Sequence, residues 1–264
     1  MARNEQRRQK KLAERKSKRN EEQRAVTRMH SSGLREQMEA AQHWPVIQSR
    51  VASRLWEHGI GGALLVRRGP GGVTAYALFL LDMYCLGVKN VIAHAAPVDV
   101  AANWLSGVSE RCGPWTDVSP EYVRKLVEES VGYALSLGLA PHRDCPAALL
   151  IFGKLDSSQC AKQFAFGSKG KPLYVAGPHD SESRIREILG TLTRTCGPDG
   201  FHYLIPVATP ELTREIDELI DRSRGRVIDL HDEPHNGLGE HDSSELQPQK
   251  RIAVSESQAD GVER

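Results

Sequence analysis

The most constraining feature of this chain is a pair of apolar segments joined by a glycine-rich turn. Residues 63–66 and 73–81 flank Gly-Pro-Gly-Gly at positions 69–72, a combination typical of a β-hairpin. The second segment is apolar at almost every position, with Thr74 as an interruption. A strand that is apolar on both faces usually lies inside a covered sheet. We therefore expect residues 73–81 to form a central strand in a sheet that is covered on both sides.

Helix signals accompany this hairpin farther along the chain. Ser119-Pro120-Glu121 supplies a capping hydroxyl, a proline for the first turn and an acid near the positive end of the helix dipole. An apolar stripe follows it, and Gly138 stands where the helix is expected to end. A second helix is predicted to begin after Asp180 or Ser181 and to end near Gly197. Thr209-Pro210-Glu211 repeats the first capping pattern and predicts a third helix.

Shorter patterns predict further elements. Residues 34–56 show helical spacing, and Pro45 is expected to begin a new helix because proline fits the first helical position. Ile47, Val51 and Leu55 then recur every four positions. Short strands are also expected at residues 147–152 and 201–207, and a second hairpin at residues 164–166 and 173–176.

Mixed hairpins and helices predict an α+β fold, with packed helices and a mixed or mainly antiparallel sheet. This single domain is expected over about residues 31–230, between a basic N-terminal arm at residues 1–30 and a disordered acidic tail at residues 231–264. The tail is rich in Asp, Glu, Ser, Gln, Gly and Pro and lacks apolar periodicity. Its histidines are expected to be solvated rather than to bind a metal, because proline and glycine break any helix that would align them. These histidines are His231, His235 and His241.

Charge is distributed unevenly along the chain. Residues 1–30, called the basic arm below, carry eleven Lys and Arg against four Glu, whereas residues 211–264 carry seven basic and fourteen acidic residues. The arm has too few apolar residues to bury a face. Lys and Arg placed on phosphates release counterions, which gives strong but weakly sequence-specific binding at low salt. The candidate anion-binding residues of the arm are Arg7, Arg8, Lys10, Lys11, Arg15, Lys16, Lys18 and Arg19.

The basic arm has three interpretations. The functional one is contact with RNA, the ribosome or another polyanion. The alternatives are a solvated tail and an arm that folds back onto the acidic C-terminus. No aromatic residue lies between the basic residues up to Arg19, so the arm itself does not predict base stacking.

Composition also predicts where the protein is found. Its five cysteines are widely spaced and odd in number, which favours a reduced cytoplasmic protein over a disulfide scaffold. No apolar stretch approaches the length of a membrane helix, and the N-terminus lacks the apolar region of a signal peptide. We therefore expect a cytoplasmic protein with no membrane partner.

The first candidate catalytic cluster directly follows the predicted central strand. Asp82 and Lys89 there would act as a base and a cation, with Cys85 as the nucleophile. The structural alternative is that Cys85 packs as a small hydrophobe, Gly87 permits a bend and Lys89 reaches solvent.

Three segments together resemble a bacterial family of conserved hypothetical proteins. They are Leu81-Asp82-x-x-Cys85-Leu86-Gly87-Val88-Lys89, Gly138-Leu139-x-Pro141-His142-x-Asp144 and Tyr174-Val175-x-Gly177-Pro178-x-Asp180-Ser181. The resemblance spans about residues 60–205. It implies a bacterial, cytoplasmic protein, and it assigns no activity and no catalytic residue.

Three further polar clusters lie beside predicted elements. Residues 141–146 include His142 near an aspartate and a cysteine, a set found at nucleophile sites, although two prolines favour a rigid connector. Residues 177–183 open a predicted helix, where His179 and Ser181 would donate to a phosphate or carboxylate, or where Asp180 or Ser181 caps the helix. Residues 196–203 contain a Pro-Asp-Gly turn before a predicted strand.

Several familiar signatures are absent. The chain has no C-x-x-C pair, no dinucleotide-binding loop after a strand, no Walker A loop and no G-x-S-x-G elbow. We therefore expect no cofactor and no metal. The leading hypothesis is a non-enzymatic binding module that contacts a polyanion through the basic arm. The rival is a small hydrolase or transferase with a cleft built from Asp82, Cys85, Lys89, His142 and His179.

Overall fold

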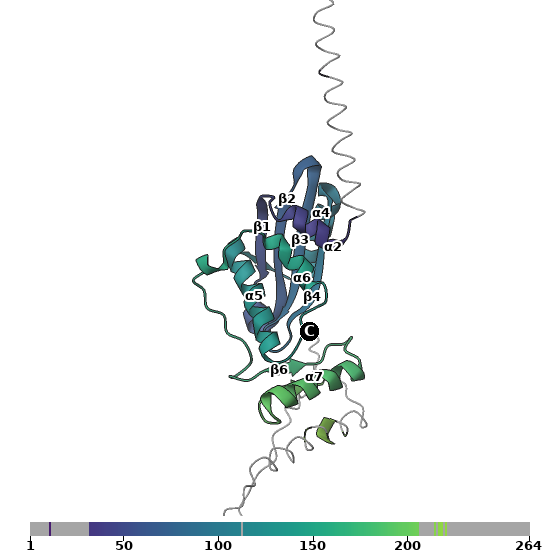
Figure 1. The fold of residues 1–264 in the computed structure, drawn as a ribbon, viewed down its shortest axis with the longest axis vertical. Helices are drawn as coiled ribbons and strands as arrows, with labels where there is room; N and C mark the ends of the chain where they lie inside the picture. The colour runs from purple at the N-terminus through teal and green to yellow at the C-terminus, as the bar shows by residue number, and fades with distance from the viewer. Residues whose placement is uncertain are drawn as a thin grey trace, which may run out of the picture.

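The structure, a computed structural model, describes residues 32–111 and 113–205, together with residues 11, 214, 216–218 and 220. Its centre is an antiparallel five-stranded sheet in the order β4-β3-β2-β1-β5, with helices packed against it (Figure 1). The α+β prediction is therefore confirmed. The strands of this sheet are β1 (Val46–Ala52), β2 (Ile60–Arg68), β3 (Val73–Asp82), β4 (Gly87–Pro97) and β5 (Trp115–Asp117).

The predicted hairpin is present as β2 and β3. The two strands pair without a break from Ile60 opposite Asp82 to Arg68 opposite Thr74. In the turn, Gly71 and Gly72 have φ angles of 66° and 73°, which are left-handed values that glycine adopts without strain. All of β3 except Leu80 is buried, and β3 lies between β2 and β4. The expectation of an interior strand is confirmed.

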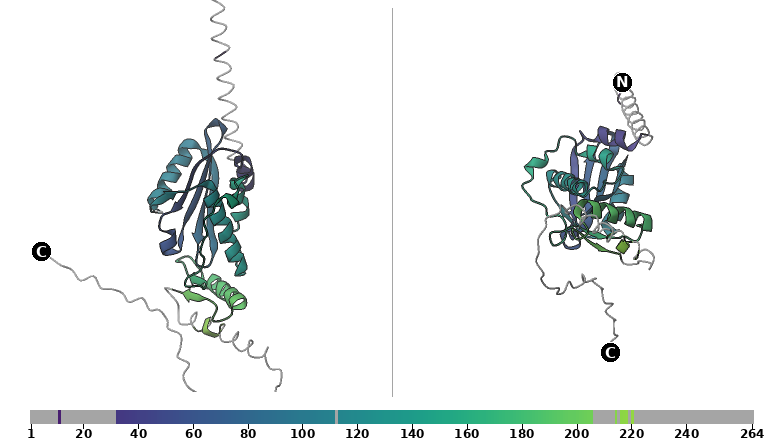
Figure 2. Two further views of the ribbon diagram at one scale, coloured as in Figure 1. Left: turned by 90° about the vertical axis from the view of Figure 1, so that its left-hand side faces the viewer. Right: turned by 60° about the horizontal axis from the view of Figure 1, so that its bottom comes forward.

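Helices cover both faces of this sheet, as its apolar strands require (Figure 2). On one face lie α2 (Leu34–Ala41), α5 (Pro120–Ser136) and α6 (Cys145–Ala148), which share the main apolar core with Leu65 and Phe79. On the other face lies α4 (Val98–Arg111), where the rings of Tyr76 and Trp104 stack with their centroids 4.2 Å apart. The short helix α3 (Leu55–His58) connects β1 to β2.

A smaller unit packs at one end of the sheet (Figure 1). It consists of a parallel pair, β6 (Leu173–Val175) and β7 (His202–Leu204), connected by α7 (Glu182–Cys196). The buried side of α7 forms a second apolar cluster with Tyr174. Residues of the β3–β4 turn and of the end of α5 belong to the same cluster. This shared cluster joins the smaller unit to the sheet.

Two of the three helices with predicted hydroxyl caps, α5 and α7, begin where the sequence indicated. The Ser119 hydroxyl accepts a hydrogen bond from the Tyr122 amide at 3.1 Å, and Ser181 accepts one from the Arg184 amide at 3.2 Å. Gly138, just beyond α5, has a φ angle of 76°, as expected for a glycine after a helix C-cap.

The helix predicted to begin at Pro45 is wrong, because residues 46–52 form β1. Ile47, Val51 and Leu55 recur every four residues, and this spacing fits the two-residue period of a strand as well as the 3.6-residue period of a helix. The backbone decides between them: β1 pairs with β2 on one side and with β5 on the other. Leu55 instead belongs to α3.

The strand predicted at residues 147–152 is also wrong. This segment forms the end of α6 and the 3-10 helix η2 (Leu149–Phe152). A short apolar run fits a buried helix as well as a strand, and Pro146 in the first turn of α6 favours the helix.

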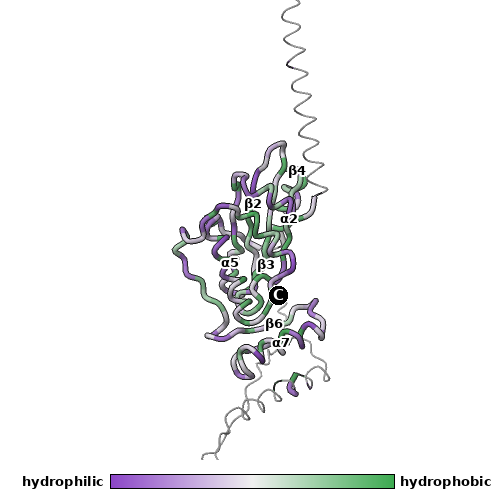
Figure 3. The backbone as a smooth tube through the Cα atoms, in the orientation of Figure 1, coloured by the Kyte–Doolittle hydropathy of each residue, from purple (hydrophilic) through white to green (hydrophobic). Residues whose placement is uncertain are grey.

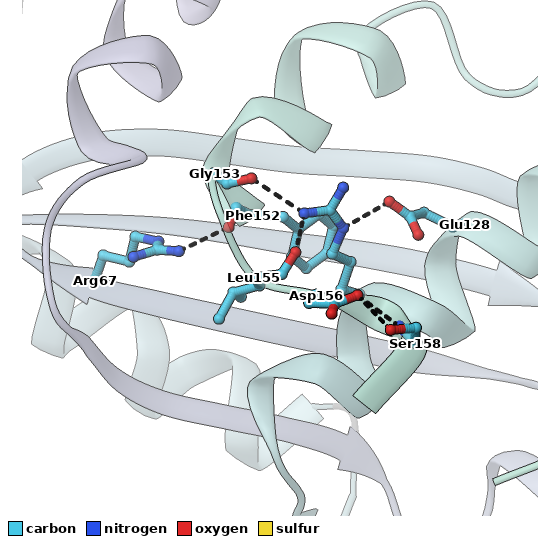
Figure 4. Close-up of polar contacts among 8 residues, drawn as sticks. Arg67, Glu128, Phe152, Gly153, Leu155, Asp156 and Ser158 are labelled. Carbon is cyan, nitrogen blue, oxygen red and sulfur yellow. Dashed lines mark hydrogen bonds and ion pairs between the residues drawn. The ribbon is translucent and has the colours of Figure 1, made fainter. Parts of the chain in front are cut away.

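Three cations hold η2 and the segment that follows it through backbone carbonyls, and Figure 4 shows the contacts made with the carbonyls of Phe152, Gly153 and Leu155. Arg67 of β2 donates to the carbonyls of Ile151 at 2.6 Å and Phe152 at 2.9 Å, and also to that of Trp44. The other two cations lie on α5. Arg124 donates to the carbonyls of Gly153 and Leu155, and Lys125 donates to those of Cys160 and Lys162. These contacts fix an irregular segment that no strand or long helix orders.

The second predicted hairpin is correct at its turn but wrong in its strands. Ser168 and Lys171 form an isolated antiparallel bridge, but residues 164–166 are not a strand. Residues 173–175 form β6, which pairs in parallel with β7. The strand expected at residues 201–207 is observed at 202–204, and residues 206 and 207 lie outside the described residues.

Several predictions concern residues that the structure does not describe. The helix cap at residues 209–211, the acidic tail at 231–264 and the basic arm apart from Lys11 lie outside the described residues. Within the part of the chain that is described, none of the helices has both the length and the apolar composition needed to cross a membrane.

Candidate functional site

The first candidate cluster lies where the β3–β4 turn meets the smaller unit. Asp82 is the last residue of β3. One oxygen of its carboxyl accepts hydrogen bonds from the amides of Tyr84 and Cys85, both at 3.0 Å. Burial raises the pKa of Asp82, although these two amides and the charge of Lys89 oppose the rise. The Asp82 carboxyl therefore orders the tight turn between β3 and β4.

An ion pair connects the sheet to the smaller unit. Lys89 of β4 places its Nζ 3.5 Å from Oδ2 of Asp180, just before α7. The same oxygen accepts hydrogen bonds from the Tyr174 hydroxyl at 3.1 Å and the Gly177 amide at 2.7 Å. Burial alone would raise the pKa of Asp180. The Gly177 amide, the Lys89 charge and the Tyr174 hydroxyl outweigh it and hold this pKa below its usual value.

Cys85 lies in the apolar cluster beneath this ion pair. Its side chain is completely buried, and it packs in the cluster that contains Tyr174 and the buried side of α7. Burial, and then the nearby Asp82 carboxylate, raise the pKa of Cys85 to about 12. Since the thiolate is the nucleophilic form of cysteine, the surroundings of Cys85 suppress its reactivity.

The two candidate histidines lie in different surroundings. The His142 amide donates to the Val88 carbonyl of β4 at 3.0 Å, and its Nδ1 accepts a hydrogen bond from the Asp144 amide at 3.2 Å. His179 is exposed in the turn in which the Asp180 amide donates to the Gly177 carbonyl. Among the described residues, no hydrogen bond or ion pair joins either imidazole to Asp82, Cys85 or Lys89.

The structure brings together the three segments that carry the family resemblance. The Lys89–Asp180 ion pair joins the first segment to the third, and the His142–Val88 hydrogen bond joins the second to the first. Sequence reasoning missed this ion pair and the buried hydroxyl of Tyr174. It offered Asp180 or Ser181 as the helix cap, and Ser181 is the residue that caps α7. The Ser181 hydroxyl, a predicted anion contact, is thus used by the helix.

Chemically, this arrangement is a network in which the polar groups bind one another. Asp82 binds turn amides, Asp180 binds Lys89 and Tyr174, and Cys85 is enclosed in an apolar cluster. No group of three His, Cys, Asp or Glu side chains suited to a metal ion occurs among the described residues. A groove of about 450 Å³ lies elsewhere, lined by residues of β1 together with Asp117, Val118 and Pro120.

The buried thiol leads to a testable prediction. Cys85 in the folded protein is expected to resist alkylation by iodoacetamide at pH 8, because burial keeps it neutral and inaccessible. Of the four cysteines that the structure describes, Cys196 is the one that is only partly buried, and it is expected to react before Cys85. Peptide mass spectrometry after timed alkylation, with and without denaturant, gives both rates. Rapid modification of Cys85 in the native protein would contradict the prediction and revive the nucleophile hypothesis.

Among the predicted anion-binding residues of the basic arm, the structure describes Lys11 alone, and its side chain is exposed.

Comparisons with protein-family models, with curated proteins and with solved structures found no match. The functional argument therefore depends on the chemistry of this chain itself.

Proposed function

We propose that this protein is a non-enzymatic binding module that contacts RNA, free or within the ribosome, through its basic arm. The observation that carries the proposal is the charge of residues 1–30, with eleven Lys and Arg, four Glu and no Asp. Such a segment attracts a polyphosphate backbone by releasing the counterions condensed on it. Its shortage of apolar residues leaves it without a core of its own, and Arg, Lys, Gln and Glu favour helix formation on a bound polyanion.

The geometry of the candidate catalytic cluster supports binding over catalysis. A cleft that used Cys85 would need an accessible thiolate, and this thiol is fully buried with a raised pKa. A cleft that used Lys89 would need a cation available to substrate, and its Nζ lies beside Asp180. An active site places its nucleophile, base and orienting group in direct contact. These side chains instead serve the turn and the junction between the sheet and the smaller unit.

The proposal includes a cytoplasmic location in a bacterial cell, where RNA and ribosomes are accessible. The four cysteines that the structure describes, Cys85, Cys145, Cys160 and Cys196, all carry free thiols. Free thiols are usual in reducing compartments.

Deletion of the basic arm tests the proposed function. We expect the full chain to retain total bacterial RNA on a pull-down at 50–100 mM salt, and residues 31–264 to retain at least tenfold less, because the deletion removes the eleven Lys and Arg of the arm and leaves 24 basic against 30 acidic residues. Far-UV circular dichroism of both proteins would show whether the domain is unchanged. Equal RNA retention by the two proteins would overturn the proposal.

A further inference from the structure

A second stretch of the chain is cationic, and unlike the basic arm it carries no acidic residue. Between Asp156 and Asp180 there is no acidic residue, and the segment carries Lys162, Lys169 and Lys171. All three lysine side chains are exposed. The segment passes along the outside of α5 towards β6 (Figure 1), and hydrophobic and hydrophilic residues are interspersed along it (Figure 3). This part of the surface therefore combines positive charge with apolar side chains.

Aromatic rings are fixed among these lysines. Phe164 stacks on Trp56 of α3, with ring centroids 5.6 Å apart and planes at 8°, and its other neighbour is Tyr122 of α5 at 5.0 Å and 79°. Phe166 stacks on Tyr133 at 4.9 Å. Trp56 is 41% exposed despite its stacking contact. A large ring that is both fixed and exposed loses little conformational entropy when a second flat group stacks on it.

Lys169 is held in an unfavourable backbone conformation. Its φ angle is 52°, and it is the one residue other than glycine with a positive φ among the described residues. It occupies the first central position of a two-residue turn, closed by hydrogen bonds between Ser168 and Lys171 at 2.7 and 3.1 Å. Asparagine, aspartate and glycine are favoured at such a position, and other residues are strained there. Lysine does not favour this backbone conformation, so the conformation of the turn does not explain why a positive charge stands at position 169.

We infer that Trp56, with Lys162, Lys169 and Lys171, forms a second RNA contact on the folded domain, specific for unpaired nucleotides. The inference rests on the proposed function, because it concerns the same ligand. An unpaired base stacks on the exposed indole while the lysines contact adjacent phosphates, a combination common to proteins that bind single strands. Paired bases are stacked within their helix and do not reach such a ring. The basic arm supplies charge, and this surface distinguishes single strands from duplexes.

Two substitutions in the full chain test the inference. Lys169→Asn removes one charge but places Asn-Gly in the turn, so it is expected to raise the melting temperature by about 2–4 °C while weakening RNA binding about threefold. Trp56→Ala is expected to weaken binding about tenfold or more, and Trp56→Phe to restore part of the loss. Lys154→Asn is the matched control, because Lys154 is also exposed but lies outside the acid-free segment.

The binding probes separate stacking from charge. Fluorescein-labelled single-stranded U20 and the same strand in a duplex are titrated by anisotropy, and inorganic polyphosphate serves as a competitor without bases. We expect Trp56→Ala to weaken U20 binding and to leave duplex and polyphosphate binding unchanged. Equal losses on all three probes would overturn the inference, as would equal losses from Lys154→Asn and Lys169→Asn.

This inference and the proposed function fail in different ways. If removal of the basic arm weakens U20 binding but the Trp56 and Lys169 variants bind like the wild type, the proposed function stands and the second contact is refuted. If the variants weaken binding and removal of the arm does not, the second contact stands and the arm has no role. If the full chain does not bind U20, both are refuted.

Discussion

Replacing Arg67 with methionine is expected to lower the free energy of unfolding by about 3–5 kcal/mol, the largest effect of any substitution considered for this fold. The Arg67 side chain lies in β2 and is 5% exposed. Its guanidinium donates to the carbonyls of Trp44, Ile151 and Phe152. Methionine fills a similar volume and donates nothing, so all three carbonyls would lose a charged partner. The Phe152 carbonyl keeps the Leu155 amide as a donor, and the Trp44 contact is only partly buried, so the Ile151 carbonyl is the one left buried without another donor among the described residues. Each buried carbonyl left without a partner costs about 1–3 kcal/mol.

Two further substitutions, one at Arg68 and one at Arg67 itself, show whether the loss of stability comes from the hydrogen bonds of the Arg67 guanidinium. Arg68 is adjacent in the same strand and exposed, so Arg68→Met removes the same charge and is expected to change stability by less than about 0.5 kcal/mol. Arg67→Lys keeps the charge but cannot present the planar fork that reaches three acceptors, and we expect an intermediate loss. Urea unfolding followed by circular dichroism measures all three. A loss below about 1 kcal/mol for Arg67→Met would show that the guanidinium does not hold η2 in place.

The elements predicted correctly are those whose information is local. The β2–β3 hairpin follows from an apolar run beside a glycine-rich turn, and α5 and α7 follow from a capping serine beside an apolar stripe. In each case, residues close together in the sequence determine both the element and its end. Tertiary packing then stabilises the same helix or strand that the local sequence already favours.

The errors arise where two structures share one local pattern. The four-residue spacing after Pro45 fits a strand as well as a helix, and the partners β2 and β5 decide in favour of a strand. The apolar run at residues 147–152 fits a strand as well as a helix, and there the distant Arg67 caps the end of η2. No prediction covered residues 90–118, where most of β4, α4 and β5 lie, although Gly113-Pro114 in this region is a turn signal.

The candidate site shows the same limit more clearly. The sequence singled out the segments that meet at the end of the sheet, but it could not pair Lys89 with Asp180, which lies 91 positions later in the chain. That contact depends on how the β6-α7-β7 unit docks against the β3–β4 turn. It also changes what the residues do, since a lysine considered as a catalytic cation is bound to a carboxylate.

Salt is expected to have the largest effect on binding. Each phosphate neutralised on a single strand lowers the slope of log K against log salt by about 0.7. Contacts from all eight candidate residues of the arm, Arg7 to Arg19, would give a slope of about −5.6 and a loss of about 10³-fold in affinity between 50 and 200 mM salt. Anisotropy titrations with U20 across this range measure the slope for the full chain and for residues 31–264.

Charge removal within the arm shows whether the slope originates there. Replacing Arg7, Arg8, Lys10 and Lys11 with glutamine removes half of the candidate contacts of the arm and is expected to reduce the arm's share of the slope by about half, from about −5.6 to about −2.8. Residues 31–264 lack the arm, so the salt dependence of their binding would come from Lys162, Lys169 and Lys171. Three phosphate contacts by these lysines would give a slope near −2. A full-chain slope no steeper than that of residues 31–264 would mean that the arm does not touch RNA, whatever its charge. A steep slope that persists after the four glutamine substitutions would place the contacts in its second half, among Arg15, Lys16, Lys18 and Arg19.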